Sequence, residues 1–209
     1  MSETKKQLMS LLASHAVIRA PEGECFELAS GAKSRYYFDG KRVIQSPEAF
    51  PLIGELIWEH ARGVEAAAVG GLAAGCIPIA DAAVAFDAYV GKCGLRAFYV
   101  RSTKKEHGTK EKLYQAFSED DNDLVSEGRR VLIVDDVLTT GNSILEAIQE
   151  VEARGAEVVS ILVLVDRQNP IANENLRLRY PVTALFNADS NGDLSFADGQ
   201  GTAKELVHV

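Results

Sequence analysis

Residues 131–143, with the sequence VLIVDDVLTTGNS, constrain the fold more than any other stretch of the chain. Four aliphatic residues run directly into two aspartates, and an unbroken Val/Ile/Leu run is typical of a strand covered on both faces of a parallel sheet. A helical pattern begins at Ile144, so the polar residues lie between the carboxyl end of a strand and the N-terminus of a helix. Open α/β sheets bind their ligands at this position.

The side chains of this stretch indicate what kind of ligand it binds. Residues 139–143 offer hydroxyls, backbone N–H groups and a helix N-terminus, which together suit a phosphate dianion. Asp135 and Asp136 cannot bind that phosphate because like charges repel, so they need hydroxyl groups or a cation. We therefore expect a ligand that carries both a phosphate and a sugar diol. The alternatives are structural: the aspartates cap neighbouring backbone, and the loop caps the helix that follows it.

Length and charge limit the class of protein. A chain of 209 residues is long enough for one α/β domain with a sizeable core. The formal charge of −8 disfavours general binding to nucleic acid or to an anionic membrane. No apolar run approaches the ~20 residues of a membrane span, and the N-terminus is too polar for a signal peptide. The three cysteines lack paired or metal-ligand spacing, so we expect reduced thiols in a cytoplasmic protein.

The remaining pattern alternates strands with helices, which predicts a doubly wound, mostly parallel sheet with helices on both faces. We expect a single domain, with an N-terminal helix and a small hood in residues 1–45, an α/β core in 46–190 and a tail in 191–209. Ser46 suits the N-cap of the second helix, and Pro51 is expected to bend that helix. The expected helices are 3–14, 47–62, 77–85 and 144–154; the expected strands are 25–29, 35–39, 64–69, 95–101, 131–134, 158–165 and 183–186. The hood is expected to be a hairpin of the strands 25–29 and 35–39, with a turn at 30–34.

Residues 101–112, with the sequence RSTKKEHGTKEK, are basic within an acidic chain. No buried face can be drawn through them, and loops of this length without structure are usually functional or disordered. This composition favours a basic lid that covers an anionic substrate. A solvated basic loop without a function is the alternative.

Residues 131–143 resemble the 5-phosphoribosyl 1-pyrophosphate signature of the type I phosphoribosyltransferases. Four further segments resemble parts of the orotate phosphoribosyltransferases in the right chain order. Residues 26–39 are similar to the hood, 70–80 to the pyrophosphate loop, 101–108 to the catalytic loop and 164–168 to the orotate-binding segment. The resemblance implies a type I phosphoribosyltransferase fold. It also implies transfer of phosphoribose from 5-phosphoribosyl 1-pyrophosphate to orotate, giving orotidine 5′-monophosphate for pyrimidine (UMP) biosynthesis.

The resemblance also assigns roles to residues. Asp135 and Asp136 would face the ribose hydroxyls, directly or through Mg²⁺ and water. The 5′-phosphate would lie in the loop of Thr139, Thr140, Gly141, Asn142 and Ser143. The pyrophosphate would be covered by Arg101, Lys104, Lys105 and His107, with Lys105 and His107 acting on the leaving group. Arg167 offers a planar fork that matches the carboxylate of orotate, and Tyr37 and Phe38 could stack on the pyrimidine or be plain hood core. The implied cofactor is Mg²⁺, held mainly by substrate oxygens.

The family implies a homodimer in which the catalytic loop reaches the neighbouring subunit's site. Ser102 stands where many members carry lysine, and Ala29 stands where some do, so this chain lacks cations that those members have. Three alternatives stay open. The first is a phosphoribosyltransferase for a purine or another base, and the second is a non-catalytic regulator that binds RNA or DNA. The third is a degraded enzyme that needs a partner, which Ser102 suggests.

Overall fold

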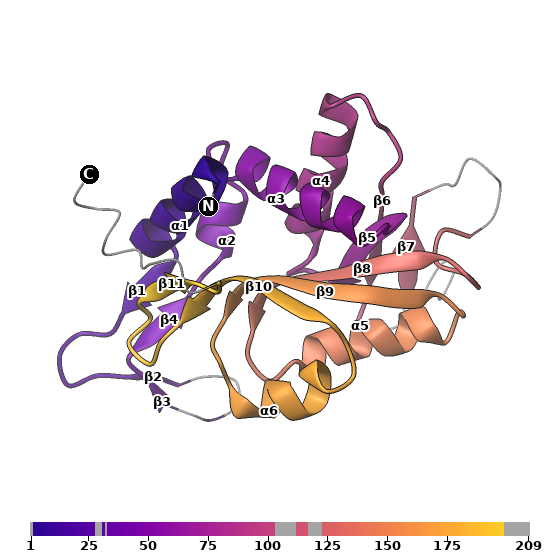
Figure 1. Ribbon diagram of the computed structural model, residues 1–209. Helices are drawn as coiled ribbons and strands as arrows, with labels where there is room; N and C mark the ends of the chain where they lie inside the picture. The colour runs from indigo at the N-terminus through magenta and orange to yellow at the C-terminus, as the bar shows by residue number, and fades with distance from the viewer. Residues whose placement is uncertain (1, 28–30, 32, 103–111, 117–122, 199–209) are drawn as a thin grey trace.

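The computed structural model describes residues 2–27, 31, 33–102, 112–116 and 123–198 (Figure 1). Within these residues, seven strands form a central sheet in the order β11-β10-β9-β8-β5-β6-β7. Pairing is parallel from β10 through β6 and antiparallel at the two edges, β11 and β7. The strands are β1 Val17–Arg19, β2 Phe26–Glu27, β3 Lys33–Ser34, β4 Tyr36–Phe38, β5 Ala68–Leu72, β6 Arg96–Val100, β7 Leu113–Gln115, β8 Arg130–Leu138, β9 Glu157–Asp166, β10 Val182–Ala188 and β11 Leu194–Phe196.

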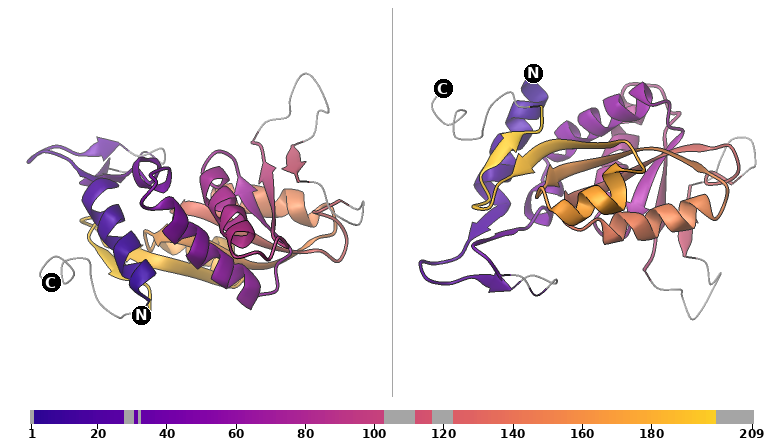
Figure 2. Two further views of the ribbon diagram at one scale, coloured as in Figure 1. Left: turned by 90° about the horizontal axis from the view of Figure 1, so that it is seen from above. Right: turned by 60° about the horizontal axis from the view of Figure 1, so that its bottom comes forward.

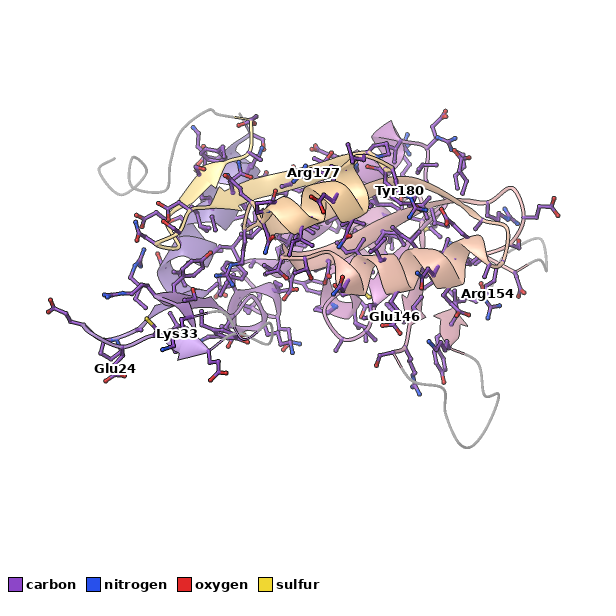
Figure 3. The ribbon with its side chains drawn as sticks, turned by 90° about the horizontal axis from the view of Figure 1, so that it is seen from below. Glu24, Lys33, Glu146, Arg154, Arg177 and Tyr180 are labelled. Carbon is purple, nitrogen blue, oxygen red and sulfur yellow. The ribbon has the colours of Figure 1, made fainter. Side chains whose placement is uncertain are left out.

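Helices cover both faces of this sheet, as the sequence predicts (Figure 1). The helices are α1 Glu3–His15, α2 Lys41–Ile44, α3 Phe50–Gly63, α4 Ile77–Tyr89, α5 Asn142–Glu152 and α6 Pro170–Ala172, with a π-helical turn, η1, at Asn173–Arg177. The first four lie on one face, and α5, α6 and η1 lie on the other. Figure 3 shows Arg177 and Tyr180 on the same side of the sheet as Glu146, which lies in α5, and Arg154, which follows that helix. None of the described helices is long and apolar enough to cross a membrane.

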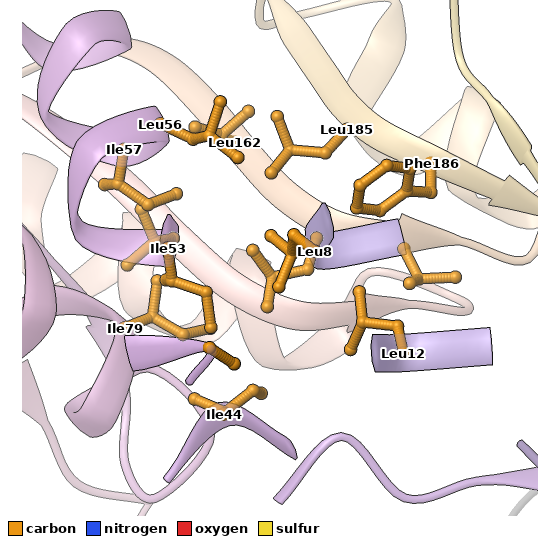
Figure 4. Packing of buried hydrophobic residues seen from close by; sticks show 14 of the residues in the cluster. Leu8, Leu12, Ile44, Ile53, Leu56, Ile57, Ile79, Leu162, Leu185 and Phe186 are labelled. Atoms are coloured by element: carbon orange, nitrogen blue, oxygen red, sulfur yellow. The ribbon is translucent and has the colours of Figure 1, made fainter. Parts of the chain in front are cut away.

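The N-terminal helix belongs to the main core. Leu8 and Leu12 of α1 are fully buried in the same cluster as Ile53 of α3 and Phe186 of β10 (Figure 4). Both views of Figure 2 show α1 beside β10 and β11. Burial of this apolar surface stabilises the position of the hood, because the hood strands follow α1 directly.

The hood has a different pairing from the predicted hairpin. β4 pairs antiparallel with β1, and β2 pairs antiparallel with β3, so the described residues of β2 pair with Lys33 and Ser34 and not with β4. The sequence pattern missed β1 and β3 because strands of two or three residues are too short to show a period. Alternation in β4 buries Tyr36 and Phe38 and leaves Tyr37 47% exposed.

Two other boundaries differ from expectation. Ser46 does cap a turn, since its hydroxyl accepts from the Ala49 N–H at 3.2 Å, but α3 begins only at Phe50. Pro51 therefore lies in the first turn of the helix, where its missing N–H costs nothing. At the other end of the chain, Phe196 of β11 is 2% exposed, and its ring packs against that of Phe186 at a tilt of 55°, so the sheet extends beyond residue 190.

Candidate functional site

The carboxyl ends of four neighbouring parallel strands bring the candidate residues to one edge of the sheet. β9 leads into Arg167, and its neighbour β8 carries the two aspartates and leads into the 139–143 loop. The next strands along, β5 and β6, lead into the 73–76 turn and Arg101. Parallel strands expose these ends at a single edge, which is where open α/β sheets bind ligands. The fold thus assembles the phosphate loop, the acidic pair and the two arginines from distant parts of the chain.

The aspartate pair lies within β8 itself, because the strand continues to Leu138 and does not end at Val134. Asp135 is 7% exposed. Its carboxylate accepts from the Ser143 hydroxyl at 2.8 Å and from the Asp136 N–H at 3.0 Å. The Asp136 carboxylate accepts from the Val137 N–H at 2.9 Å. These bonds fix both carboxylates, as the capping alternative requires, yet they do not remove the repulsion between them.

Burial and the neighbouring Asp136 charge raise the pKa of Asp135 to about 7. Burial also raises the pKa of Asp136, although the Val137 N–H, the Asp135 side chain and the Lys41 charge oppose that rise. Two adjacent buried carboxylates favour a ligand that donates hydroxyl protons or brings positive charge. Lys41, which directly follows the hood, was missed by sequence reasoning because nothing in its local pattern links it to the acids.

Glycines keep the space around the acids open. A Cβ atom at Gly75 would lie 2.7 Å from Asp135 Oδ1 and 3.3 Å from Asp136 Oδ1. A Cβ atom at Gly40 would lie 3.3 Å from Asp136 Oδ2. By contrast, Gly70 and Gly71 are inside β5, where a side chain would meet the carbonyls of Phe98 and Val134. The glycine-rich segment therefore serves sheet packing at its start and the site at its end.

The 139–143 loop presents the N-terminus of α5 without a side-chain cap. The N-cap residue is Gly141, at φ +82°, and within the described residues no side-chain hydrogen bond caps this end of the helix. Ser143, which would precede a helix that began at Ile144, lies inside the first turn of α5, and its hydroxyl donates to Asp135. The first N–H groups of a helix have no partner within it and carry partial positive charge. The capping alternative is therefore not found for this loop, and its geometry suits an anion.

The turn η1 packs against the 139–143 loop, a contact that the sequence did not predict. Asn175 Nδ2 donates to the Thr140 carbonyl at 3.0 Å. The side chain of Leu176 is fully buried against Gly141. Arg177 forms an ion pair with Asp166 at the end of β9. No periodic signal marks this segment, because its role depends on contacts with residues about 35 positions earlier.

Arg167 lies against the hood. Its Nε donates to the Tyr36 hydroxyl at 2.9 Å, and its Nη2 donates to the Ser34 hydroxyl at 3.2 Å. The guanidinium carbon lies 4.5 Å from the centre of the Tyr36 ring. The sequence predicts base stacking by Tyr37 and Phe38, but the aromatic side chain that contacts Arg167 is that of Tyr36. Stacking of Tyr37 or Phe38 on a base stays a prediction.

Arg101 is the first residue of the basic segment 101–112. Its N–H donates to the Lys112 carbonyl at 2.8 Å, and its guanidinium lies 4.2 Å from the centre of the Tyr114 ring. β6 and β7 pair antiparallel, so Arg101 and Lys112 lie side by side at the ligand-binding edge. Lys104, Lys105 and His107 lie outside the described residues.

Comparison with known proteins shows the family to which this chain belongs. A model of the phosphoribosyl transferase domain matches residues 40–177. An orotate phosphoribosyltransferase of Rhodopseudomonas palustris is 35% identical over 161 residues, which cover 77% of this chain and 83% of that protein. The orotate phosphoribosyltransferase of Methanocaldococcus jannaschii is 38% identical over 175 residues, covering 84% and 89%. The chain belongs to the orotate phosphoribosyltransferase family.

Solved structures of orotate phosphoribosyltransferases share the fold. The Mycobacterium tuberculosis enzyme in complex with Fe(III) dicitrate has a TM-score of 0.71 and 29% identity, covering 88% of this chain and 96% of that one. The same enzyme in complex with 5-phospho-α-D-ribosyl 1-diphosphate has a TM-score of 0.67 and 28% identity over the same shares. The predicted type I phosphoribosyltransferase fold is confirmed. An adenine phosphoribosyltransferase from Thermoanaerobacter pseudethanolicus, 20% identical over 86% of this chain and 99% of that one with a TM-score of 0.58, shows the fold alone.

Proposed function

We propose that this chain transfers the phosphoribosyl group of 5-phosphoribosyl 1-pyrophosphate to orotate, releasing pyrophosphate and forming orotidine 5′-monophosphate for pyrimidine synthesis. The observation that carries the proposal is the meeting of three groups at one sheet edge: the buried aspartate pair, the uncapped N-terminus of α5 and the Arg167 fork. They match the diol, the phosphate and the carboxylate of the two substrates. The family relationship supports the same reaction.

On the donor side, the N–H groups of the α5 first turn, including that of Ser143, bind the 5′-phosphate together with the hydroxyls of Thr139 and Thr140. The Ser143 hydroxyl donates to Asp135. Asp135 and Asp136 accept hydrogen bonds from the ribose hydroxyls. The glycosidic bond breaks toward an oxocarbenium-like state, so charge accumulates on the departing pyrophosphate. Lys105 and His107, with Arg101 and Lys104, stabilise this charge as it develops, and His107 donates a hydrogen bond or proton there.

The donor set at the site suits magnesium without forming a complete protein cage. No group of three or more potential ligand residues is found among the described residues, whereas Asp135 and Asp136 supply carboxylate oxygens at the ribose position. Magnesium prefers oxygen ligands and is commonly held by substrate phosphates with few carboxylates. We propose that substrate oxygens would provide most ligands of the magnesium ion, with Asp136 contributing through water, and that the ion would supply positive charge against the pyrophosphate. The free thiols of Cys25, Cys76 and Cys93 agree with a cytoplasmic enzyme.

Turnover of radiolabelled orotate tests the function. We expect orotidine 5′-monophosphate and pyrophosphate in amounts that depend on 5-phosphoribosyl 1-pyrophosphate and fall on removal of magnesium with a chelator. Hypoxanthine and adenine should not be turned over. Purine turnover without orotate turnover would favour the other-base alternative, and activity of the purified chain alone argues against the need for a partner.

Replacing Arg167 by alanine should raise the KM for orotate by roughly 100-fold, because a bidentate charge-assisted pair is lost from a half-buried position. The KM for 5-phosphoribosyl 1-pyrophosphate should change by less than about threefold, because Arg167 does not contact that half of the site. Steady-state kinetics with each substrate varied in turn measures both. Arg179→Ala is the matched control, since Arg179 also lies over a tyrosine ring, that of Tyr180, but away from the site. Equal changes in both KM values would contradict the assigned role of Arg167.

We also propose a homodimer in which the 101–112 loop completes the partner's site. An exposed apolar groove on α3 and α4 supports such an interface. It is lined by Phe50, Pro51, Ala82, Ala85, Phe86 and Tyr89. Tyr89 is 87% exposed although its ring contacts Phe86, and a large exposed aromatic in an apolar patch indicates an interaction surface.

Mixing two inactive variants tests the shared site. Lys105→Ala chains retain the aspartates and Asp136→Asn chains retain the loop, so a mixed dimer contains one intact site. Random reassortment should restore up to about a quarter of the wild-type rate. The control mixes Lys105→Ala with His107→Ala, which places both defects on the loop and leaves no intact site. If the first mixture stays inactive after reassortment, the loop acts within its own subunit.

A further inference from the structure

The contacts of Arg167 use one particular edge of its guanidinium. A guanidinium can grip a carboxylate with Nε and Nη2 or with Nη1 and Nη2. Here the Tyr36 hydroxyl accepts from Nε at 2.9 Å and the Ser34 hydroxyl accepts from Nη2 at 3.2 Å, so the side edge is occupied by the hood. Nη1 has no hydrogen-bond partner within the described part of the chain. The end edge of the fork is therefore the one presented to a ligand.

Tyr36 and Ser34 are themselves fixed. Tyr36 is 2% exposed, and a Cβ atom at Gly192 would lie 2.6 Å from its ring, so the turn between β10 and β11 packs directly on the ring. Arg167 lies over the same ring at 4.5 Å. The Ser34 hydroxyl donates to the Tyr36 carbonyl at 2.7 Å and accepts from the Tyr36 N–H at 3.3 Å. These contacts leave the two hydroxyls little freedom to move away from Arg167.

We propose that Tyr36 and Ser34 are positioning residues for base recognition: they hold Arg167 by its Nε–Nη2 edge so that its Nη1–Nη2 edge meets the carboxylate of orotate. This inference rests on the proposed function. It assigns the choice of base to the hood and β9 together, although the two hydroxyls themselves act only through Arg167. An arginine side chain that is not held loses much rotamer freedom on binding, and a fixed one has already lost it.

The test replaces Tyr36 by phenylalanine, which keeps the ring under the guanidinium and removes only the hydroxyl. We expect the KM for orotate to rise about five- to tenfold, which is within the range of the typical net contribution of one hydrogen bond. The KM for 5-phosphoribosyl 1-pyrophosphate and kcat should stay within about twofold. Ser34→Ala should give a similar split. Tyr180→Phe is the matched control, because its hydroxyl donates to Glu152 at 2.8 Å far from Arg167 and its loss should change neither KM.

A double-mutant cycle separates positioning from other roles. Tyr36→Phe should have no further effect on the orotate KM in an Arg167→Ala background, because the hydroxyl then has nothing to position. A full effect in that background, an equal rise of both KM values, or an unchanged orotate KM in both hood variants would overturn the inference. Wild-type chains that fail to turn over orotate would remove the proposed function, and this inference with it. Wild-type turnover with unaffected hood variants would remove this inference alone.

Discussion

Gly141→Ala should raise the KM for 5-phosphoribosyl 1-pyrophosphate at least tenfold and leave the KM for orotate nearly unchanged. Gly141 has φ +82°, a conformation that costs a residue with a side chain ~1–2 kcal/mol. An added Cβ atom would also lie 2.5 Å from Cδ1 of Leu176, which is fully buried and cannot swing aside freely. The backbone must therefore shift, and it is this backbone that presents N–H groups to the phosphate. A tenfold change corresponds to about 1.4 kcal/mol, which is within the cost of that shift.

Gly128→Ala is the matched control for Gly141→Ala. Gly128 has φ +75°, and an added Cβ atom there would have no neighbour within 4 Å. It should lower stability by a similar backbone cost without changing either KM. Combining Gly141→Ala with Leu176→Ala removes the clash but not the strain, so it should recover part of the lost affinity. If Gly141→Ala left the KM for the sugar pyrophosphate unchanged, the loop could not be the phosphate site.

Elements with strong local signals were predictable from the sequence. The buried run in β8, the amphipathic α5 and the alternation of strands with helices are encoded by neighbouring residues, and the structure confirms them. The edge strands β7 and β11 and the hood strand β1 were missed. Each has three residues, and each forms because a longer strand or β4 offers it a partner. Such pairing depends on tertiary context and leaves little trace in a short window.

The residues of the candidate site also divide into those that the sequence located and those that it missed. The aspartate pair lies near the carboxyl end of β8, and the 139–143 loop follows that strand, so the local pattern located both. The resemblance to the family located Arg167, which directly follows β9. Tyr36, Lys41 and Asn175 were missed as contributors because each acts on a residue far away in the chain. The bond from Arg167 to Tyr36, for example, spans 131 positions. The choice of Tyr37 and Phe38 over Tyr36 shows the limit: β-strand alternation decides which aromatic faces Arg167, and its phase could not be fixed without the partner strand β1.

Asp135→Asn should make the ligand-free protein more stable at pH 8 while reducing kcat/KM by about 100-fold or more. Burial and the Asp136 charge raise the pKa of Asp135 from 3.8 to about 7 in the folded state. Because the folded state holds this proton more tightly than the unfolded state, the carboxyl group contributes its full stabilisation below about pH 4. That contribution is lost as the pH rises through about 7. Above that pH the ionised group carries its whole cost, at most about 4 kcal/mol at ~1.4 kcal/mol per pKa unit. Asparagine has the same shape without the charge.

Thermal unfolding from pH 4.5 to 8 measures this effect on Asp135→Asn. The variant should unfold several degrees above the wild type at pH 8, given ~2–4 °C per kcal/mol for a chain of this size, and the gap should close toward pH 4.5. Glu59→Gln, which removes an exposed charge, is the control and should show no such trend. Magnesium with 5-phosphoribosyl 1-pyrophosphate should stabilise the wild type more than the variant, because the ligand offsets charge that only the wild type carries. A variant less stable than the wild type at pH 8 would mean that the bonds from Ser143 and the Asp136 N–H outweigh burial and repulsion. In the expected case, the acidic pair lowers stability in the free enzyme and recovers it on binding the ribose.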